Sequence, residues 1–276
     1  MSEVVNLHPL RQFRYPVLGE CISPDVFESK TVAEIEQLVV WEGNKQKQLK
    51  DLFRVEKTTG ISENSLAIKV CGDSSEVRRV GARMTKGEIS IEGNVGMHLG
   101  EQMKGGRISV VGNVGGWVGS MMSGGMIEIR GDCGDYLGAP YRGSNVGVHG
   151  GAKITVYGNV GNECGAHLRN GVIRVFGGAG QFAGFRMRGG TLYVRDGCGG
   201  RVGACMIDGK IVVGGCLESL LPTFIIDGVK QKAKVEEESV EGPFLVFLGD
   251  RAESGKGKLY VSREKNPELT RFERLL

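Results

Sequence analysis

The residue types that most often hold metals are few in this chain and widely scattered. Four histidines stand at His8, His98, His149 and His167, and none has a second ligand at a spacing that suits a metal. The cysteines form no C-x-x-C pair of the kind used by zinc or iron–sulfur sites; they are Cys21, Cys71, Cys133, Cys164, Cys198, Cys205 and Cys216. We therefore expect reduced, mostly buried thiols, and neither a metal nor a cofactor site in this chain.

The usual catalytic motifs are also missing from the sequence. It contains no H-E-x-x-H, no G-x-S-x-G and no Walker A segment. The glycine-rich stretch 177–180 precedes no helix pattern, so it does not predict a dinucleotide loop. Four aspartates, Asp132, Asp135, Asp196 and Asp208, do not share one position of the repeat described below, which argues against a glycosidase or lyase. We expect no catalytic residue here.

The regular spacing of large, mostly aromatic side chains indicates a binding surface. Large side chains recur at one position, which we call the corner column: His98, Trp117, Tyr136, Glu163, Phe182 and Arg201. Aromatic rings that line up on a surface mark a protein interface, or lie under another segment of the same chain. Both alternatives stay open from the sequence, and the solvent exposure of Trp117 decides between them.

A single interruption of the repeat, residues 139–150, is either a second place of contact or a harmless insertion. It carries Tyr141 and Arg142. We predict a partner interface made of Trp117, Tyr136, Phe182, His98, Tyr141 and Arg142.

A glycine-rich repeat must position these side chains. The chain has 276 residues, of which 46 are glycine. One glycine column runs through Gly81, Gly100, Gly119, Gly138, Gly165, Gly184 and Gly203, in steps of nineteen residues apart from one step of twenty-seven. Because glycine adopts positive φ without a steric penalty, this column indicates sharp turns at regular intervals.

Short strands lie between the glycines. Apolar residues alternate in each copy, as at Ile108 and Val110, which is typical of a strand with one buried face. Strands this short and this evenly spaced leave no room for helical crossovers, so each copy is one turn of a coil and neighbouring strands pair in parallel. The sequence therefore predicts an all-β chain, a parallel β-helix of about seven 19-residue turns.

Three further columns are apolar and should point inward. They begin at Val95, Leu99 and Met103, and they include Cys133, Cys164 and Cys198, which we interpret as small core residues. A polar column, Asn94, Asn113, Asp132 and Asn159, sits at another corner, where its side chains should bond to one another and to the backbone.

The two ends depart from the repeat, and we divide the chain into residues 1–63, 64–215 and 216–276. Ser23-Pro24 and the capping box Thr31–Glu34 predict helices in a small N-terminal cap. The strand pattern begins at Ser65, with Ile68 and Val70 inward. After Gly215 the pattern decays, so we expect an irregular C-terminal cap over the open end of the stack.

Charge and hydropathy exclude other classes. The formal net charge is +3, with 35 basic and 32 acidic residues intermixed, which argues against a nucleic-acid binder. No apolar run is long enough for a membrane span, and the N-terminus lacks the pattern of a secretory signal. We expect a cytoplasmic chain with no nucleic-acid or membrane partner.

The motif G-N-V-G-x-x-x-G, as in Gly93–Gly100, resembles the G-x-G-x-G repeat domain that is shared by the glutamate synthase large subunit and the C subunit of formylmethanofuran dehydrogenase. The resemblance to the second family is close. It extends through Ser23–Phe27, the interruption Tyr136–Gly143 and the tail at Gly242–Phe244, so it covers nearly the whole chain.

That resemblance implies a right-handed β-helix that acts as a non-catalytic scaffold subunit in methanogenesis. The complex reduces carbon dioxide and fixes it as formylmethanofuran. The implied partners are an amidohydrolase-like subunit and formate-dehydrogenase-like subunits, which would hold the molybdenum or tungsten pterin and the iron–sulfur clusters. Two alternatives remain: the C subunit of a bacterial formyltransferase/hydrolase complex, and a glutamate-synthase-type structural domain.

Overall fold

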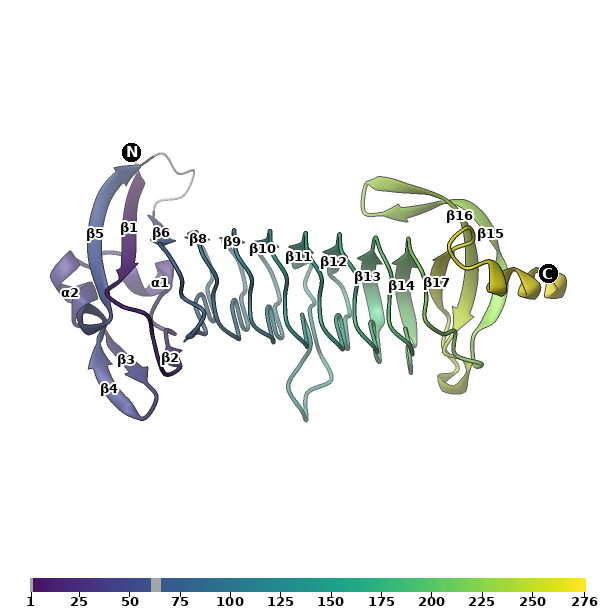
Figure 1. Ribbon diagram of the computed structural model, residues 1–276, viewed down its shortest axis with the longest axis horizontal. Coiled ribbons are helices and arrows are strands. Elements are labelled where there is room, and N and C mark those ends of the chain that lie inside the picture. Colours follow the sequence, from purple (N-terminus) through teal and green to yellow (C-terminus); the bar gives the residue numbers. More distant parts are fainter. Residues whose placement is uncertain (1, 61–65) are drawn as a thin grey trace.

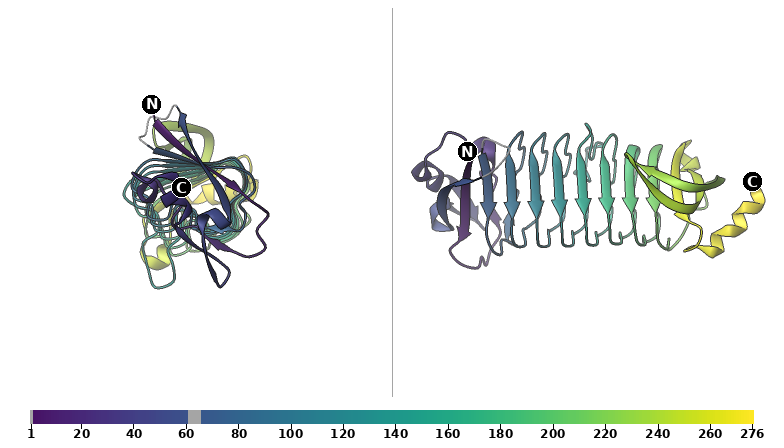
Figure 2. Two further views of the ribbon diagram at one scale, coloured as in Figure 1. Left: turned by 90° about the vertical axis from the view of Figure 1, so that its left-hand side faces the viewer. Right: turned by 90° about the horizontal axis from the view of Figure 1, so that it is seen from above.

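The computed structural model describes residues 2–60 and 66–276 as an elongated, mostly β molecule (Figure 1). The N-terminal elements lie at one end of the rod and the C-terminal elements at the other, with a row of stacked turns between them (Figure 2). A 13-stranded sheet runs along the rod in the order β15-β16-β17-β14-β13-β12-β11-β10-β9-β8-β6-β1-β5. A second sheet of four strands has the order β4-β3-β2-β7. The prediction of an all-β chain is confirmed.

The middle of the large sheet is parallel. Its strands are β6 (Leu66–Val70), β8 (Glu88–Ile91), β9 (Arg107–Val110), β10 (Met126–Ile129), β11 (Lys153–Val156), β12 (Val172–Val175), β13 (Arg188–Val194), β14 (Asp208–Val213) and β17 (Gly257–Ser262). Equivalent residues of the repeat face each other in neighbouring strands; for example, Ile127 pairs with Ile108 on one side and Ile154 on the other. All three are fully buried, as the alternating pattern predicts.

A second parallel ladder runs along the rod outside these strands. It joins successive turns through single bridges, from Ser74 to Val95 and onward through Val114, Cys133, Val160, Ala179 and Cys198 to Leu217. Side chains of the predicted inward columns fill the space between the two ladders; Leu99 and Met103, for example, have no exposed surface. Cys133, Cys164 and Cys198 are buried among them, which confirms their interpretation as core residues.

The expectation of mostly buried thiols holds only for the inward columns of the repeat. Cys21, Cys71 and Cys205 are half-buried, and Cys216 is exposed. These four lie outside the inward columns, so nothing in the stacking of the turns forces them into the core.

The turns approach one another closely at their corners. All seven glycines of the predicted column have φ between 59° and 70°. At Gly119 a Cβ atom would lie 2.5 Å from Cδ1 of Ile154 in the next turn, so both the φ value and the space favour glycine.

The polar column is confirmed as a hydrogen-bonded ladder. The backbone N–H of Asn113 donates to Oδ1 of Asn94 at 2.8 Å, and that of Asp132 donates to Oδ1 of Asn113 at 2.8 Å. Asp132 and Asn159 accept from the following turns in the same way.

The N-terminal segment contains the two predicted helix starts, but both helices are short. Helix α1 (Pro24–Phe27) follows Ser23, and α2 (Val32–Glu36) begins with the expected capping box, in which the Glu34 carboxylate accepts the Thr31 N–H at 2.7 Å. The segment has more strand than helix: its strands are β1 (Ser2–Pro9), β2 (Val17–Leu18), β3 (Val39–Glu42), β4 (Lys45–Gln48) and β5 (Phe53–Gly60). A 3₁₀ turn, η1 (Leu49–Asp51), precedes β5, and β7 (Val77–Arg78), from the following segment, completes the small sheet. Ile68 and Val70 on β6 are buried as expected. Ser65 and the predicted boundary between residues 63 and 64 lie outside the described residues.

The expectation of an irregular C-terminal cap is wrong. Strands β15 (Ile225–Val235) and β16 (Glu238–Gly249) form a long antiparallel hairpin, β17 pairs with both β16 and β14, and η2 (Arg251–Glu253) and η3 (Pro267–Leu275) are 3₁₀ helices. The hairpin folds back along the strand face, where Ala233, Val235 and Phe244 bury Tyr193 and Val212 (Figure 1). The antiparallel pairs at both ends make the large sheet mixed rather than purely parallel.

Over residues 2–60 and 66–276, no helix combines the length and the apolar character that crossing a bilayer requires.

Candidate functional site

The corner column owes its direction to an unusual backbone conformation. His98, Trp117 and Tyr136 have φ of 65°, 63° and 65°, in the left-handed region that residues other than glycine seldom occupy. The same region holds Arg79, Glu163, Phe182 and Arg201. Apart from Arg201, the backbone N–H of each of these residues donates to a carbonyl of the next turn; that of Trp117, for example, donates to the carbonyl of Asp135 at 2.8 Å. The side chains therefore line up along the outside of the rod.

Three of these rings form a stack. The Trp117 and Tyr136 rings lie 4.3 Å apart with 18° between their planes, and His98 lies 6.2 Å from Trp117 at 14°. The closer separation is near the distance between adjacent strands, so the pitch of the coil itself sets the stacking.

The interruption at residues 139–150 folds against this stack. The Tyr141 ring lies 5.3 Å from Trp117 and 5.7 Å from His98, and its hydroxyl is 2.8 Å from Nδ1 of His98. The loop is also bonded to the turns on both sides, through Gly147 N–H to the carbonyl of His167 and Val148 N–H to that of Gly138.

Trp117 is consequently half-buried, and the loop contributes to this through Tyr141. Its stacking partners among the described residues come from the corner column and from residues 139–150, with none from 2–60 or 216–276. The alternative that the terminal segments bury the corner column does not hold for Trp117.

A buried carboxylate lies beneath the loop. Glu101 is 4% exposed, and its Oε2 lies 3.1 Å from Nε of Arg79 and 3.7 Å from Nδ1 of His98. Burial, and then hydrogen bonding to Glu101, raises the pKa of Tyr141 to about 12. Burial also lowers the pKa of His98, against the opposing charge of Glu101. The Tyr141 hydroxyl and Nδ1 of His98 share a hydrogen bond whose donor depends on the His98 tautomer, and this bond positions the loop.

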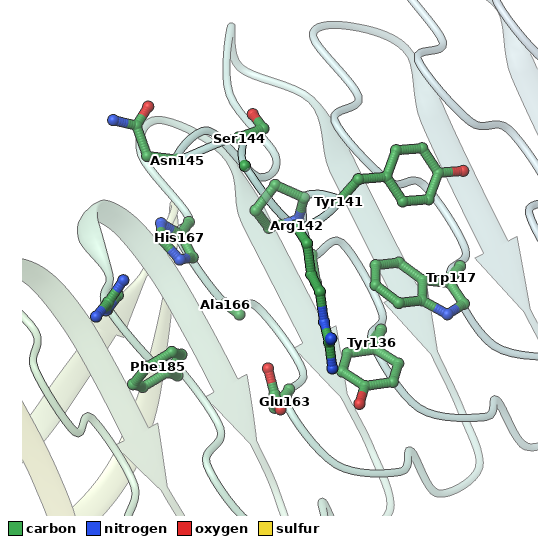
Figure 3. Close-up of a pocket in the computed structure, with 14 residues that line it drawn as sticks. Trp117, Tyr136, Tyr141, Arg142, Ser144, Asn145, Glu163, Ala166, His167 and Phe185 are labelled. Atoms are coloured by element: carbon green, nitrogen blue, oxygen red, sulfur yellow. The ribbon is translucent and has the colours of Figure 1, made fainter.

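A pocket of about 770 Å³ opens between the loop and the corner column (Figure 3). Figure 3 shows Trp117, Tyr136 and Tyr141 on one side, His167 and Phe185 on the other, and the Arg142 side chain extending toward Tyr136 and Glu163. The remaining lining residues are Ala139, Pro140, Gly143, Ser144, Asn145, Ala166 and Arg186.

The structure brings the predicted interface residues together to different degrees. Trp117, Tyr136, Tyr141 and Arg142 line the pocket. His98 is stacked behind Trp117, outside the lining. Phe182 is also outside it, on the far side, where its ring meets Phe185 edge-on at 5.8 Å.

Sequence reasoning missed His167, Phe185 and Arg186. His167 and Arg186 belong to a second left-handed column, four residues after the first, with φ of 56° and 52°. Gln102, Met121 and Cys205 occupy the same column. The four-residue offset from the corner column was the signal that could have found His167 and Arg186, whereas Phe185 lies outside that column.

The chemistry that this arrangement offers is binding. It presents aromatic faces, two guanidinium groups and one carboxylate to the same space. The pKa of His167 is lowered by burial, so its imidazole is neutral near pH 7. In the part of the chain that the structure describes, no three His, Cys, Asp or Glu side chains gather closely enough to hold a metal ion.

Comparisons with known proteins give relatives of one kind. The C subunit of the molybdenum-containing formylmethanofuran dehydrogenase 1 of Methanosarcina barkeri is 37% identical over 99 residues, which cover 36% of this chain and 33% of that protein. The C subunit of the tungsten-containing formylmethanofuran dehydrogenase 2 of Methanothermobacter wolfeii is 38% identical over 100 residues, 36% and 37% of the two chains. The chain thus matches only about a third of the length of these two relatives.

A further relative matches almost from end to end. The C subunit of the tungsten-containing formylmethanofuran dehydrogenase 2 of Methanococcus maripaludis is 45% identical over 262 residues, 92% of this chain and 94% of that protein. Among solved structures, the formyltransferase/hydrolase complex from Methylorubrum extorquens in complex with methylofuran contains a similar chain, with a TM-score of 0.81 and 28% identity over 93% of this chain and 99% of that one. No family model matches the sequence. On the strength of the nearly full-length match, this chain belongs to the family of formylmethanofuran dehydrogenase C subunits.

Proposed function

We propose that this chain is the structural C subunit of a cytoplasmic formylmethanofuran dehydrogenase complex, and that it serves as a scaffold without catalytic residues of its own. The observation that carries the proposal is the 45% identity over 262 residues, which at 92% of this chain extends beyond the repeat into both terminal segments. A match confined to the glycine repeat would support only a shared fold.

The architecture suits a scaffold. We infer that the successive turns wind as a parallel β-helix, since two parallel ladders connect equivalent residues of neighbouring turns. The right-handed coil is inferred from the usual hand of connections between parallel strands. Bending such a rod requires breaking backbone hydrogen bonds in several turns at once. A rod of this kind holds two neighbours at a fixed separation, which matters when an intermediate passes between their active sites.

The proposed partners are the amidohydrolase-like and formate-dehydrogenase-like subunits, and these would carry the pterin metal and the iron–sulfur clusters. The side of the rod with the corner column is the proposed contact surface. It combines stacked rings with a pocket of about 770 Å³, and aromatic anchors next to pockets are typical centres of protein interfaces.

A second candidate is the equivalent subunit of a formyltransferase/hydrolase complex, favoured by the 0.81 TM-score to that structure. The metal content separates the two. Molybdenum or tungsten in the complex isolated through this chain supports the dehydrogenase, whereas a complex that lacks both metals supports the second candidate.

The contact surface is tested with Trp117→Asp combined with Phe182→Asp. Aspartate tolerates the left-handed backbone of both positions, so the fold should survive, which circular dichroism checks. We expect the recovery of partner subunits on the tagged chain to fall at least tenfold, which corresponds to about 1.4 kcal/mol. Val111→Asp, at an exposed apolar residue just after β9, is the matched control. Unchanged recovery in the double variant would reject this surface as the interface.

A further inference from the structure

Unpaired arginines line the pocket or lie near it. They are Arg142, Arg169, Arg186, Arg188 and Arg201, which we call the arginine patch, and all five are exposed. Among residues 2–60 and 66–276, none of them forms an ion pair. Arginines of the strand face differ: Arg107, Arg130 and Arg174 each lie within 3.1 Å of a glutamate oxygen. With a net charge of only +3, the patch is a local concentration of charge.

Three members of the patch lie at the pocket or over rings at its edge. Arg142, from the loop of residues 139–150, and Arg186, from the second left-handed column, line the pocket. Arg186 lies over the Phe185 ring at 5.2 Å, and Arg201 over Phe182 at 5.1 Å. A guanidinium resting on a ring is held extended while its N–H groups remain free to donate.

Arg169 and Arg188 lie beside His167. The positive charges of Arg186, Arg188 and Arg169 add to the effect of burial in lowering the pKa of His167. Like charges gathered without counterions repel one another, so this arrangement brings no stability to the isolated chain. Glu163 is the only carboxylate among the lining residues that the structure describes, and it forms no ion pair in the described part of the chain.

We propose that the arginine patch and the aromatic pocket together bind an acidic segment of a partner subunit. Carboxylates of that segment pair with Arg142 and Arg186, and an apolar or aromatic side chain between them enters the space bounded by Trp117, Tyr136 and Phe185. The inference rests on the proposed function and names the chemistry of the partner at that same surface.

The shape of the site favours a peptide over a nucleic acid. Guanidinium forks bind carboxylates with two parallel hydrogen bonds. Nucleic-acid binders carry basic residues along a groove or stripe, whereas here they gather at one pocket.

The first test reverses the charge of the patch. Arg142→Glu with Arg186→Glu is introduced into the full-length tagged chain, and the complex is isolated from cells at low salt. We expect the recovery of partner subunits to fall at least tenfold. The control is Arg271→Glu with Arg274→Glu at the far end of the rod, where Arg271 lies over Phe272 at the same 5.2 Å, and this variant should stay within twofold of wild type. Equal recovery from both double variants would overturn the inference.

The second test identifies the partner group. Arg142→Lys with Arg186→Lys keeps the charge and supplies amines, which a carbodiimide couples to carboxylates in direct contact. We expect cross-linked peptides that join position 142 or 186 to an aspartate or glutamate of a partner subunit. An intact complex without such cross-links contradicts the proposal, and so does a complex that nuclease treatment dissolves.

These outcomes separate the two proposals. If Trp117→Asp with Phe182→Asp leaves the complex intact, the proposed interface itself fails. If that variant disrupts the complex while the charge reversal does not, the interface stands and only the acidic segment is rejected.

Discussion

The closeness of successive turns predicts the cost of adding one methyl group at Gly112. A Cβ atom there would lie 2.6 Å from the carbonyl carbon and oxygen of Gly93 and 2.6 Å from Oδ1 of Asn94, all in the preceding turn. Two of these three atoms are backbone, so no side-chain rotation relieves the contact. Gly112→Ala must therefore push the two turns apart.

The magnitude follows from two contributions. Overpacking by one methyl group costs about 1–3 kcal/mol. The Asn94 Oδ1 atom that would be displaced accepts the Asn113 N–H at 2.8 Å, and losing that hydrogen bond adds about 0.5–1.5 kcal/mol. We expect Gly112→Ala to lower the free energy of unfolding by about 2–4 kcal/mol, which lowers the melting temperature by about 4–16 °C for a chain of this size.

Gly178→Ala is the matched control. Gly178 occupies the polar column, and a Cβ atom there would meet nothing closer than the Gly197 carbonyl oxygen at 3.2 Å. We expect a change within about 1 kcal/mol of zero, because the entropy lost from the unfolded chain offsets a slight crowding. Thermal unfolding followed by circular dichroism measures both variants. If Gly112→Ala is as stable as Gly178→Ala, the turns do not stack as closely as the structure has them.

Two other predictions concern the loop and the N-terminal sheet. Tyr141→Phe removes the hydroxyl that lies 2.8 Å from His98 Nδ1. We expect the free energy of unfolding to fall by about 1 kcal/mol, and the amides of residues 139–150 to exchange their hydrogens faster. Unchanged exchange would show that the hydroxyl does not hold the loop. Glu42 is buried, and hydrogen bonds from Lys47 and Arg11 lower the pKa of its carboxyl group. The ionised carboxylate therefore stabilises the fold above the ordinary glutamate pKa, and this stabilisation is lost as the pH falls through the lower pKa of the folded state. Glu42→Gln should therefore melt below wild type at pH 7, and the gap should close below about pH 4; a gap in melting temperature that is independent of pH contradicts this.

The repeat could be predicted in detail because each of its positions is tested several times within one sequence. Ile89, Ile108 and Ile127 occupy equivalent positions on adjacent turns, and all are buried. A single alternating pair such as Ile108 and Val110 is weak evidence for a strand, but seven copies, spaced by nineteen residues in every step except one of twenty-seven, favour one arrangement that buries all of them.

The C-terminal hairpin could not be found in this way because it occurs once. Most of β15 is solvent-exposed, and its run of lysines hides the alternation that ends at the buried Ala233 and Val235. Those two residues pack against Tyr193 and Val212, which belong to earlier strands and lie on the outward face of the parallel sheet. No local sequence pattern predicts that contact, so only the structure identifies it.

The corner column explains why part of the candidate site could be predicted from the sequence. Glycine would adopt the left-handed backbone at Trp117 or Phe182 with about 1 kcal/mol less conformational strain. The fold itself therefore does not require large side chains at these positions. The hydrogen bonds that the N–H groups from His98 to Phe182 in this column donate to the next turn are made by the backbone and do not depend on the side chain. Large rings at positions where the fold tolerates glycine therefore point to contacts made outside the repeat. Residues 139–150 supply one such contact, because Tyr141 packs against Trp117. Phe182 is half-buried and lies outside the pocket that the loop lines, so we expect the contact surface for the partner to extend to Phe182.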